Sequence, residues 1–111
     1  DFAFGYIPCT RALTKAQVKT DYELNTGRAI TRFFEENSIN YLDIPAVLVH
    51  SHGPFTWGAD ALGAVLNAKM LEDTAMTAYH TEMLGQKEPI EPFLLEKHFS
   101  RKHGKDAYYG Q

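Results

Sequence analysis

Two histidines, His50 and His52, are the side chains in this chain best suited to chemistry. A neutral imidazole nitrogen can bind a metal ion or move a proton near neutral pH. The apolar run Ala46 to Val49 precedes them and has the composition of a short strand buried on both faces. If that strand continued, both histidines would lie on one face, and Gly53-Pro54 would end the strand behind them. This stretch is therefore a candidate metal site, weighed against the commoner role of a buried histidine as a hydrogen-bonded core residue.

Length and composition exclude several classes of protein. The 111 residues suit one small domain, and 44% hydrophobic with 23% charged residues is a globular composition. The net charge is −3 and the eleven Lys and Arg are scattered, which argues against a nucleic-acid surface. No apolar run reaches the roughly 18 residues of a membrane span. Cys9 is the only cysteine, so no internal disulfide can form, and we expect a cytoplasmic protein without a membrane partner.

A pair of helical patterns precedes the histidines. Thr14 is expected to cap a helix, with Gln17 completing a capping box. Gly27 is expected to interrupt that helix. Beyond it, apolar residues on one face and charged residues on the other predict an amphipathic continuation that ends at Asn37-Ser38.

Two more helices are predicted after the histidines. The longer runs from about Ala59 to Leu84, with Asp60 favouring its N-terminus. The last runs from Ile90 to His103, with Pro92 in its first turn and Gly104 closing it. Residues at three- and four-residue steps predict a buried stripe on the long helix, consisting of Leu62, Val65, Leu66, Lys69 by its stem, Glu72, Ala75, Met76, Tyr79 and Met83.

The motif HGPFTWG, after a short apolar strand and before a long helix, resembles the metal-binding strand of the class II aldolase family. Within that family, the opening DFAFGYIPCTR and the tail HFSRKHGKDAYYGQ resemble the L-ribulose-5-phosphate 4-epimerases. The resemblance covers residues 1–111 and implies the C-terminal part of a single domain whose first half is absent. It implies an α/β fold, layered α/β/α around a mostly antiparallel sheet. The sequence itself suggests two or three short strands and about three helices.

The resemblance also implies roles for individual residues. His52 would be one ligand of a divalent metal, with zinc implied, and Asp1 and Tyr109 would be catalytic acid/base groups. The resemblance places the tyrosine that corresponds to Tyr109 in the active site of a neighbouring subunit, and so implies a cyclic homo-oligomer, a tetramer. His98 and Arg101 match further family positions near the site and rank behind Tyr109. Glu23, within the pattern Y-E-x-x-T-G, is read as a solvated helix residue and stays outside the catalytic set.

The activity implied is epimerisation of L-ribulose 5-phosphate to D-xylulose 5-phosphate by retro-aldol cleavage and aldol re-addition. Its partner would be a phosphorylated ketopentose, and the 111 residues alone are expected to be inactive. A sugar-phosphate aldolase of the same family is the alternative enzyme, disfavoured by the ending YYGQ. A second alternative is a non-catalytic α/β association module that keeps the motif residues as structure.

Overall fold

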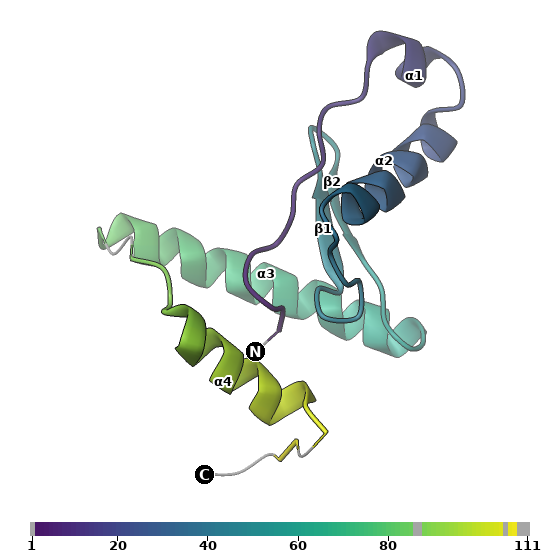
Figure 1. Cartoon of the computed structure of the whole chain (residues 1–111). Helices are drawn as coiled ribbons and strands as arrows, with labels where there is room; N and C mark the ends of the chain where they lie inside the picture. The colour runs from purple at the N-terminus through teal and green to yellow at the C-terminus, as the bar shows by residue number, and fades with distance from the viewer. Residues whose placement is uncertain (1, 86–87, 106, 109–111) are drawn as a thin grey trace.

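The computed structural model describes residues 2–85, 88–105 and 107–108. In chain order the elements are α1 (Lys15–Lys19), α2 (Tyr22–Glu36), β1 (Ala46–Val49), β2 (Gly53–Thr56), α3 (Ala61–Met83) and α4 (Pro92–His103). Figure 1 shows their arrangement. The structure is thus mixed α/β with a two-stranded antiparallel sheet in the described residues. None of the helices in these ranges is both long and apolar enough to cross a membrane.

The two strands form a hairpin at the centre of the chain. Val47 pairs with Phe55 and Leu48 with Pro54, in antiparallel register. The prediction that Gly53-Pro54 ends the strand was wrong, because the chain turns back and these residues open β2. Pro54 is tolerated because a two-stranded sheet consists of edges, where a missing N–H breaks no ladder.

The extended segment around Cys9 runs parallel to β1 on its other edge. Thr10 donates its N–H to the Leu48 carbonyl (2.9 Å), and Leu48 donates to the Pro8 carbonyl (2.8 Å). Both backbone groups of Leu48 are therefore paired on this side. The segment behaves as a rudimentary third strand, as the sequence suggested.

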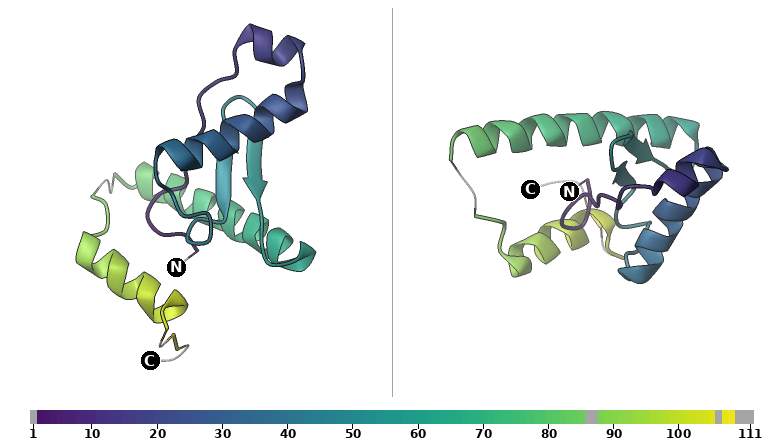
Figure 2. Two further views of the ribbon diagram at one scale, coloured as in Figure 1. Left: turned by 45° about the vertical axis from the view of Figure 1, so that its right-hand side comes forward. Right: turned by 90° about the horizontal axis from the view of Figure 1, so that it is seen from above.

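Helices α2 and α3 lie on opposite sides of the hairpin (Figure 2). From α2, the Phe34 ring packs edge to face on Trp57, 5.5 Å between centroids. On the α3 side, the Thr56 hydroxyl donates to the Ala64 carbonyl (3.0 Å) and Asn67 donates to the Trp57 carbonyl (2.7 Å). The small apolar core lies between these layers and comprises Phe34, Ile44, Ala46, Val47, Val49 and Leu71.

The local signals at helix ends are confirmed. Thr14 and Gln17 form the predicted capping box, and the Asp60 carboxylate accepts the Gly63 N–H at 2.7 Å. Pro92 begins α4 and Gly104 caps it. Gly27, however, does not interrupt a helix: α2 runs through it. A glycine costs a helix only about 1 kcal/mol relative to alanine. The packing of α2 on β1 and on Trp57 offsets that cost. The break falls at residues 20–21 instead.

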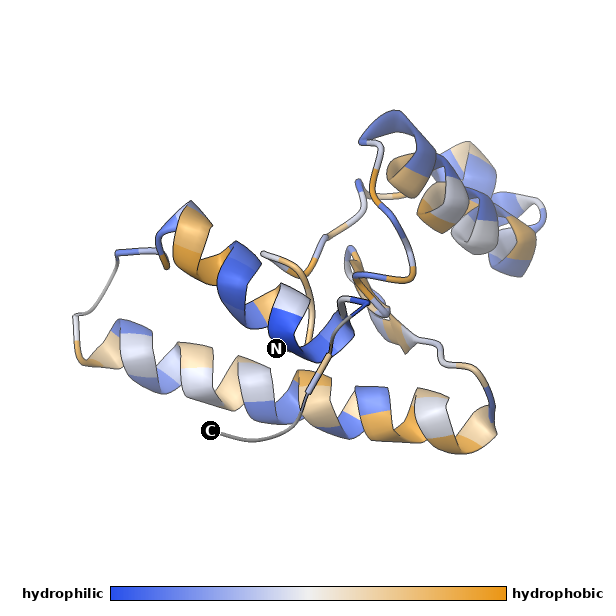
Figure 3. Ribbon diagram, turned by 60° about the horizontal axis from the view of Figure 1, so that its bottom comes forward, coloured by the Kyte–Doolittle hydropathy of each residue, from blue (hydrophilic) through white to orange (hydrophobic). Residues whose placement is uncertain are grey.

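The buried stripe predicted on α3 is wrong. Leu71 is its only buried residue in the described chain, and the predicted stripe faces solvent. Figure 3 shows hydrophobic residues along this helix. The surface area is 8677 Å², whereas a compact monomer of this mass would expose about 6,200 Å². The apolar residues do recur at helical spacing, but no other part of the described chain packs on the face of α3 that they form. Exposed large side chains on α3 are Leu62, Val65, Leu66, Met70, Met76, Tyr79 and Met83.

We predict that Gly58→Ala destabilises the junction between β2 and α3. A Cβ at Gly58 would lie 2.6 Å from the Ala64 nitrogen and 2.6 Å from the Gly63 carbonyl carbon, both backbone atoms. Such overpacking costs about 1 to 3 kcal/mol. Chemical denaturation followed by circular dichroism measures the loss.

Gly27→Ala is the matched control for this prediction. A Cβ at Gly27 meets no atom within 4 Å, and the residue is inside α2. It should raise the free energy of unfolding by about 0.5 to 1 kcal/mol. Equal effects of the two substitutions would contradict the close approach at Gly58.

Candidate metal-ligand site at the hairpin turn

The two histidines lie in the turn that joins β1 to β2. The His52 N–H donates to the Val49 carbonyl at 3.0 Å, which closes a tight turn. Ser51 is left-handed, with φ of 57°, a conformation uncommon outside glycine. Because the chain reverses here, His50 and His52 do not continue the strand, and the alternation that would put them on one strand face does not apply.

His50 is tied to its immediate surroundings. The Ser51 hydroxyl lies 2.9 Å from its Nδ1, so one ring nitrogen has a hydrogen-bond partner. Its backbone N–H donates to the Thr10 hydroxyl at 3.3 Å. Thr10 is 4% exposed and itself bonded to β1, so the base of the turn is held from the neighbouring segment.

His52 has different surroundings. Its side chain is exposed, and its ring contacts Phe55 of β2 at 5.2 Å and Tyr22 of α2 at 6.1 Å between centroids. The two ring planes are tilted by 34° and 35° from the imidazole. No described residue hydrogen-bonds to the His52 ring, so its nitrogens are open to an external ligand.

A cavity of about 320 Å³ adjoins the turn. Its walls are mostly apolar and come from the segment before α1, from α1, from the start of α2, from the end of β1 and from the turn itself. They consist of Ala12, Leu13, Val18, Tyr22, Val49, His50, Ser51 and His52. His50 and His52 thus line this cavity. Polar groups on a mostly apolar cavity wall can orient a small ligand.

The described residues do not form a metal site by themselves. In residues 2–85, 88–105 and 107–108, no three His, Cys, Asp or Glu side chains come together as a metal-binding group. A protein zinc site uses three or four ligands. Of the described residues, His52 is therefore the one that could serve as a zinc ligand. The other ligands of such a site would have to come from elsewhere.

We predict that the 111-residue chain alone binds zinc only weakly. A single imidazole lacks the chelate effect of a complete set, and the Nδ1 of His50 is shared with Ser51. Calorimetric titration with zinc should give no saturable site in the micromolar range. A stoichiometric, sub-micromolar site would contradict this and would indicate that His50 and His52 form a complete site, for example across an interface between two chains.

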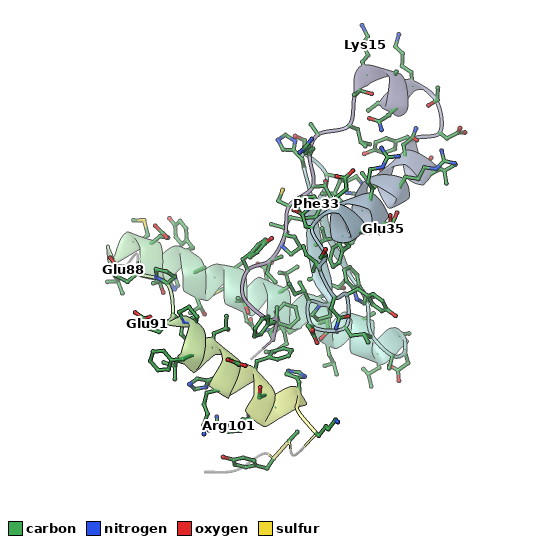
Figure 4. The ribbon with its side chains drawn as sticks, viewed as in Figure 1. Lys15, Phe33, Glu35, Glu88, Glu91 and Arg101 are labelled. Carbon is green, nitrogen blue, oxygen red and sulfur yellow. The ribbon has the colours of Figure 1, made fainter. Side chains whose placement is uncertain are left out.

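Two of the three predicted site residues, Asp1 and Tyr109, lie outside the described residues. Glu23 is exposed on α2, in keeping with a solvated helix residue. His98 and Arg101 are on α4, which makes no contact with either strand in the described residues. Arg101 lies at the lower end of the fold in Figure 4, far from the tip of the hairpin. The structure therefore does not bring them next to His52 within one chain.

Two contributors to the site were missed from the sequence. Tyr22 was assigned no role beyond an aromatic position in a helical pattern, yet its ring lies 6.1 Å from that of His52, thirty residues further along the chain. Thr10 belongs to a segment that the sequence allows as a loop or a short strand, and no role was predicted for its hydroxyl, which accepts the His50 N–H at the base of the turn. The tyrosine could have been noticed in the pattern Y-E-x-x-T-G, whereas only the fold shows which side chain an isolated threonine will meet.

Residues 1–79 match the family described as Class II Aldolase and Adducin N-terminal domain. This match covers more than half of the chain, so the protein belongs to the class II aldolase family. The chain is 46% identical over 112 aligned residues to proteins named L-ribulose-5-phosphate 4-epimerase UlaF from Salmonella paratyphi B, Salmonella choleraesuis and Salmonella typhi. The alignment covers 100% of this chain and 48% of each relative. The chain thus spans about half the length of the curated relatives it matches.

Proposed function

We propose that this chain is part of a metal-dependent enzyme that interconverts L-ribulose 5-phosphate and D-xylulose 5-phosphate. The observation that carries the proposal is the 46% identity to proteins named as 4-epimerases, which extends over every residue of the chain. The hairpin turn supports it, because His52 is exposed and its ring nitrogens have no partner among the described residues.

The proposed reaction breaks the C3–C4 bond, turns the released aldehyde over and joins the bond again. A divalent cation, proposed to be zinc, would supply Lewis-acid stabilisation of the negative charge that develops on the substrate oxygens. His52 is the residue of this chain that would hold the cation. Its remaining ligands are proposed to come from the part of the fold that the relatives have beyond the aligned half.

Inversion at C4 also sets a requirement on proton transfer. The C4 oxygen loses a proton before cleavage and regains one after the aldehyde has turned over, so an acid/base group is needed on each face. Asp1 and Tyr109 are proposed for these two roles. A carboxylate accepts a proton readily and a phenol donates one, which suits a pair working from opposite sides.

We also propose that residues 1–111 are the C-terminal part of a single layered α/β/α domain. The exposed apolar face of α3 supports this, since such a face normally packs against another layer. The large total surface and the coverage of about half the relatives' length point the same way. A cytoplasmic location and a cyclic homotetramer stay predictions.

The test is an assay of the full-length protein with L-ribulose 5-phosphate, with products separated by chromatography. The proposal expects D-xylulose 5-phosphate and retained carbon number, in the presence of zinc and not after chelation. Net release of glycolaldehyde phosphate would indicate the alternative aldolase. Absence of both products, with zinc bound and the protein folded, would favour the non-catalytic association module.

A further inference from the structure

The His52 ring has two aromatic neighbours, Phe55 and Tyr22, and it is hydrogen-bonded to neither of them. A metal-ligating histidine usually donates its second ring N–H to a carboxylate, a carbonyl or a water, and that bond fixes the ring's orientation. In the part of the chain that the structure describes, His52 has no such bond. Its defined contacts are instead the rings of Phe55 at 5.2 Å and Tyr22 at 6.1 Å. Both distances fall within the 4.5 to 7 Å range of favourable ring pairs.

From this arrangement we infer that Tyr22 is a positioning residue for His52. An imidazole on an exposed turn can rotate about two side-chain bonds, and every unproductive orientation lowers its affinity as a ligand. Ring contacts from two different elements restrict that rotation. Because these contacts are ring to ring, they leave the ring nitrogens open for a ligand.

The backbone of Tyr22 is well placed for this task. Tyr22 is the first residue of α2, and its carbonyl accepts the hydroxyl of Thr26 at 2.9 Å. Thr26 is 4% exposed, so the donor of this bond is buried, while Tyr22 itself is half-buried. The same helix packs on the sheet through Phe34 and Trp57. The ring that meets His52 is therefore carried by a helix fixed to the hairpin at its other end.

Phe55 and Tyr22 differ in the element from which each contacts the His52 ring. It belongs to the same hairpin as His52, three residues further along, and moves with it. Tyr22 comes from another element and links the turn to α2 across the cavity next to the histidines. Tyr22 thus fixes the turn relative to the body of the fold, a role that Phe55 cannot fill.

The experiment compares Tyr22→Leu with Tyr22→Phe in the full-length protein. Tyr79→Leu is the matched control, since Tyr79 also contacts a histidine ring, that of His80 at 5.9 Å on α3, outside the cavity. Zinc affinity is measured by competition with a chelating dye. The His52 ring protons are followed by NMR in the metal-free protein, with His52→Asn to assign them.

We expect Tyr22→Leu to move the His52 ring signals and to weaken zinc binding by roughly 10-fold, the lower end for residues that orient a ligand. Tyr22→Phe keeps the ring and should restore both readouts. Tyr79→Leu should change neither. If Tyr22→Leu does not fold, Tyr22→Met carries the same expectation for ring signals and affinity, because it also removes the ring.

This inference rests on the proposed metal role of His52, and the outcomes separate the two. If the parent binds zinc and Tyr22→Leu binds it as tightly, Tyr22 is not a positioning residue and the proposed function stands. If His52→Asn keeps the zinc affinity of the parent, the ligand assignment is wrong and the inference falls with it. Loss of affinity in Tyr22→Phe as well as Tyr22→Leu would also overturn it, because the ring would then not be what matters.

Discussion

His52→Asn in the full-length protein is expected to remove the metal and, with it, all measurable epimerisation. The imidazole is the one ring in the turn whose nitrogens meet no described hydrogen-bond partner, whereas His50 shares Nδ1 with Ser51. Asparagine is close in size but offers an amide oxygen, a weaker donor for zinc than an imidazole nitrogen. Substituting residues behind the ligands already costs 10- to 100-fold in metal affinity, so losing a ligand should cost more than about 100-fold.

Metal content per protein chain, measured by atomic emission, and turnover of L-ribulose 5-phosphate are the two readouts. His80→Asn is the matched control, because it makes the same replacement at an exposed histidine on α3. Thermal unfolding should be alike for both variants in the metal-free state. Were His52→Asn to keep both zinc and activity, the metal role of the turn would be wrong, and the association module would become the better interpretation.

Signals that act over a few residues were predictive of the fold. The capping box of Thr14 and Gln17 satisfies backbone N–H groups within one turn of helix, so it is formed entirely by residues close in the sequence. Asp60 was predicted only to favour a helix N-terminus by its charge, and its carboxylate in addition accepts the Gly63 N–H there. The strand at Ala46–Val49 was predicted for a related reason, since its apolar β-branched composition suits a sheet wherever the sheet lies.

Predictions that depended on distant partners fared differently. The stripe on α3 has the right spacing, but burial needs a second surface, which no periodicity within the helix reveals. The path of the chain after Val49 was misjudged because it depends on Ser51 taking a left-handed conformation that a serine seldom adopts. The contact between Tyr22 and His52 could not be predicted from the sequence, because it depends on how α2 packs on the hairpin.

The candidate site was predictable only in part, and for a physical reason. Residue types and motif resemblance single out His52, and the structure gives that residue an exposed ring beside a cavity. A metal centre is a property of several ligands held together, and the described residues hold no such group of three. One ligand can therefore be proposed from the sequence, whereas a centre of several ligands depends on residues that the fold brings together.

Tyr109→Phe in the full-length protein is expected to leave zinc bound and to slow epimerisation by about 100- to 10,000-fold, the usual cost of losing a positioned acid/base group. The substitution removes one hydroxyl and keeps the ring, so packing by the aromatic side chain is preserved. A neutral phenol is a weak ligand compared with imidazole, so metal content should not change. This separation distinguishes Tyr109 from His52, whose loss should remove both metal and activity.

Tyr108→Phe is the control for this last prediction, since it deletes the same hydroxyl from the adjacent, exposed tyrosine. The rate constant kcat should fall in Tyr109→Phe with KM little altered, because a group that transfers a proton acts in the transition state more than in substrate binding. Full activity in Tyr109→Phe would return this tyrosine to a packing role. A fall in zinc content would contradict the division between one residue that binds the metal and another that moves a proton.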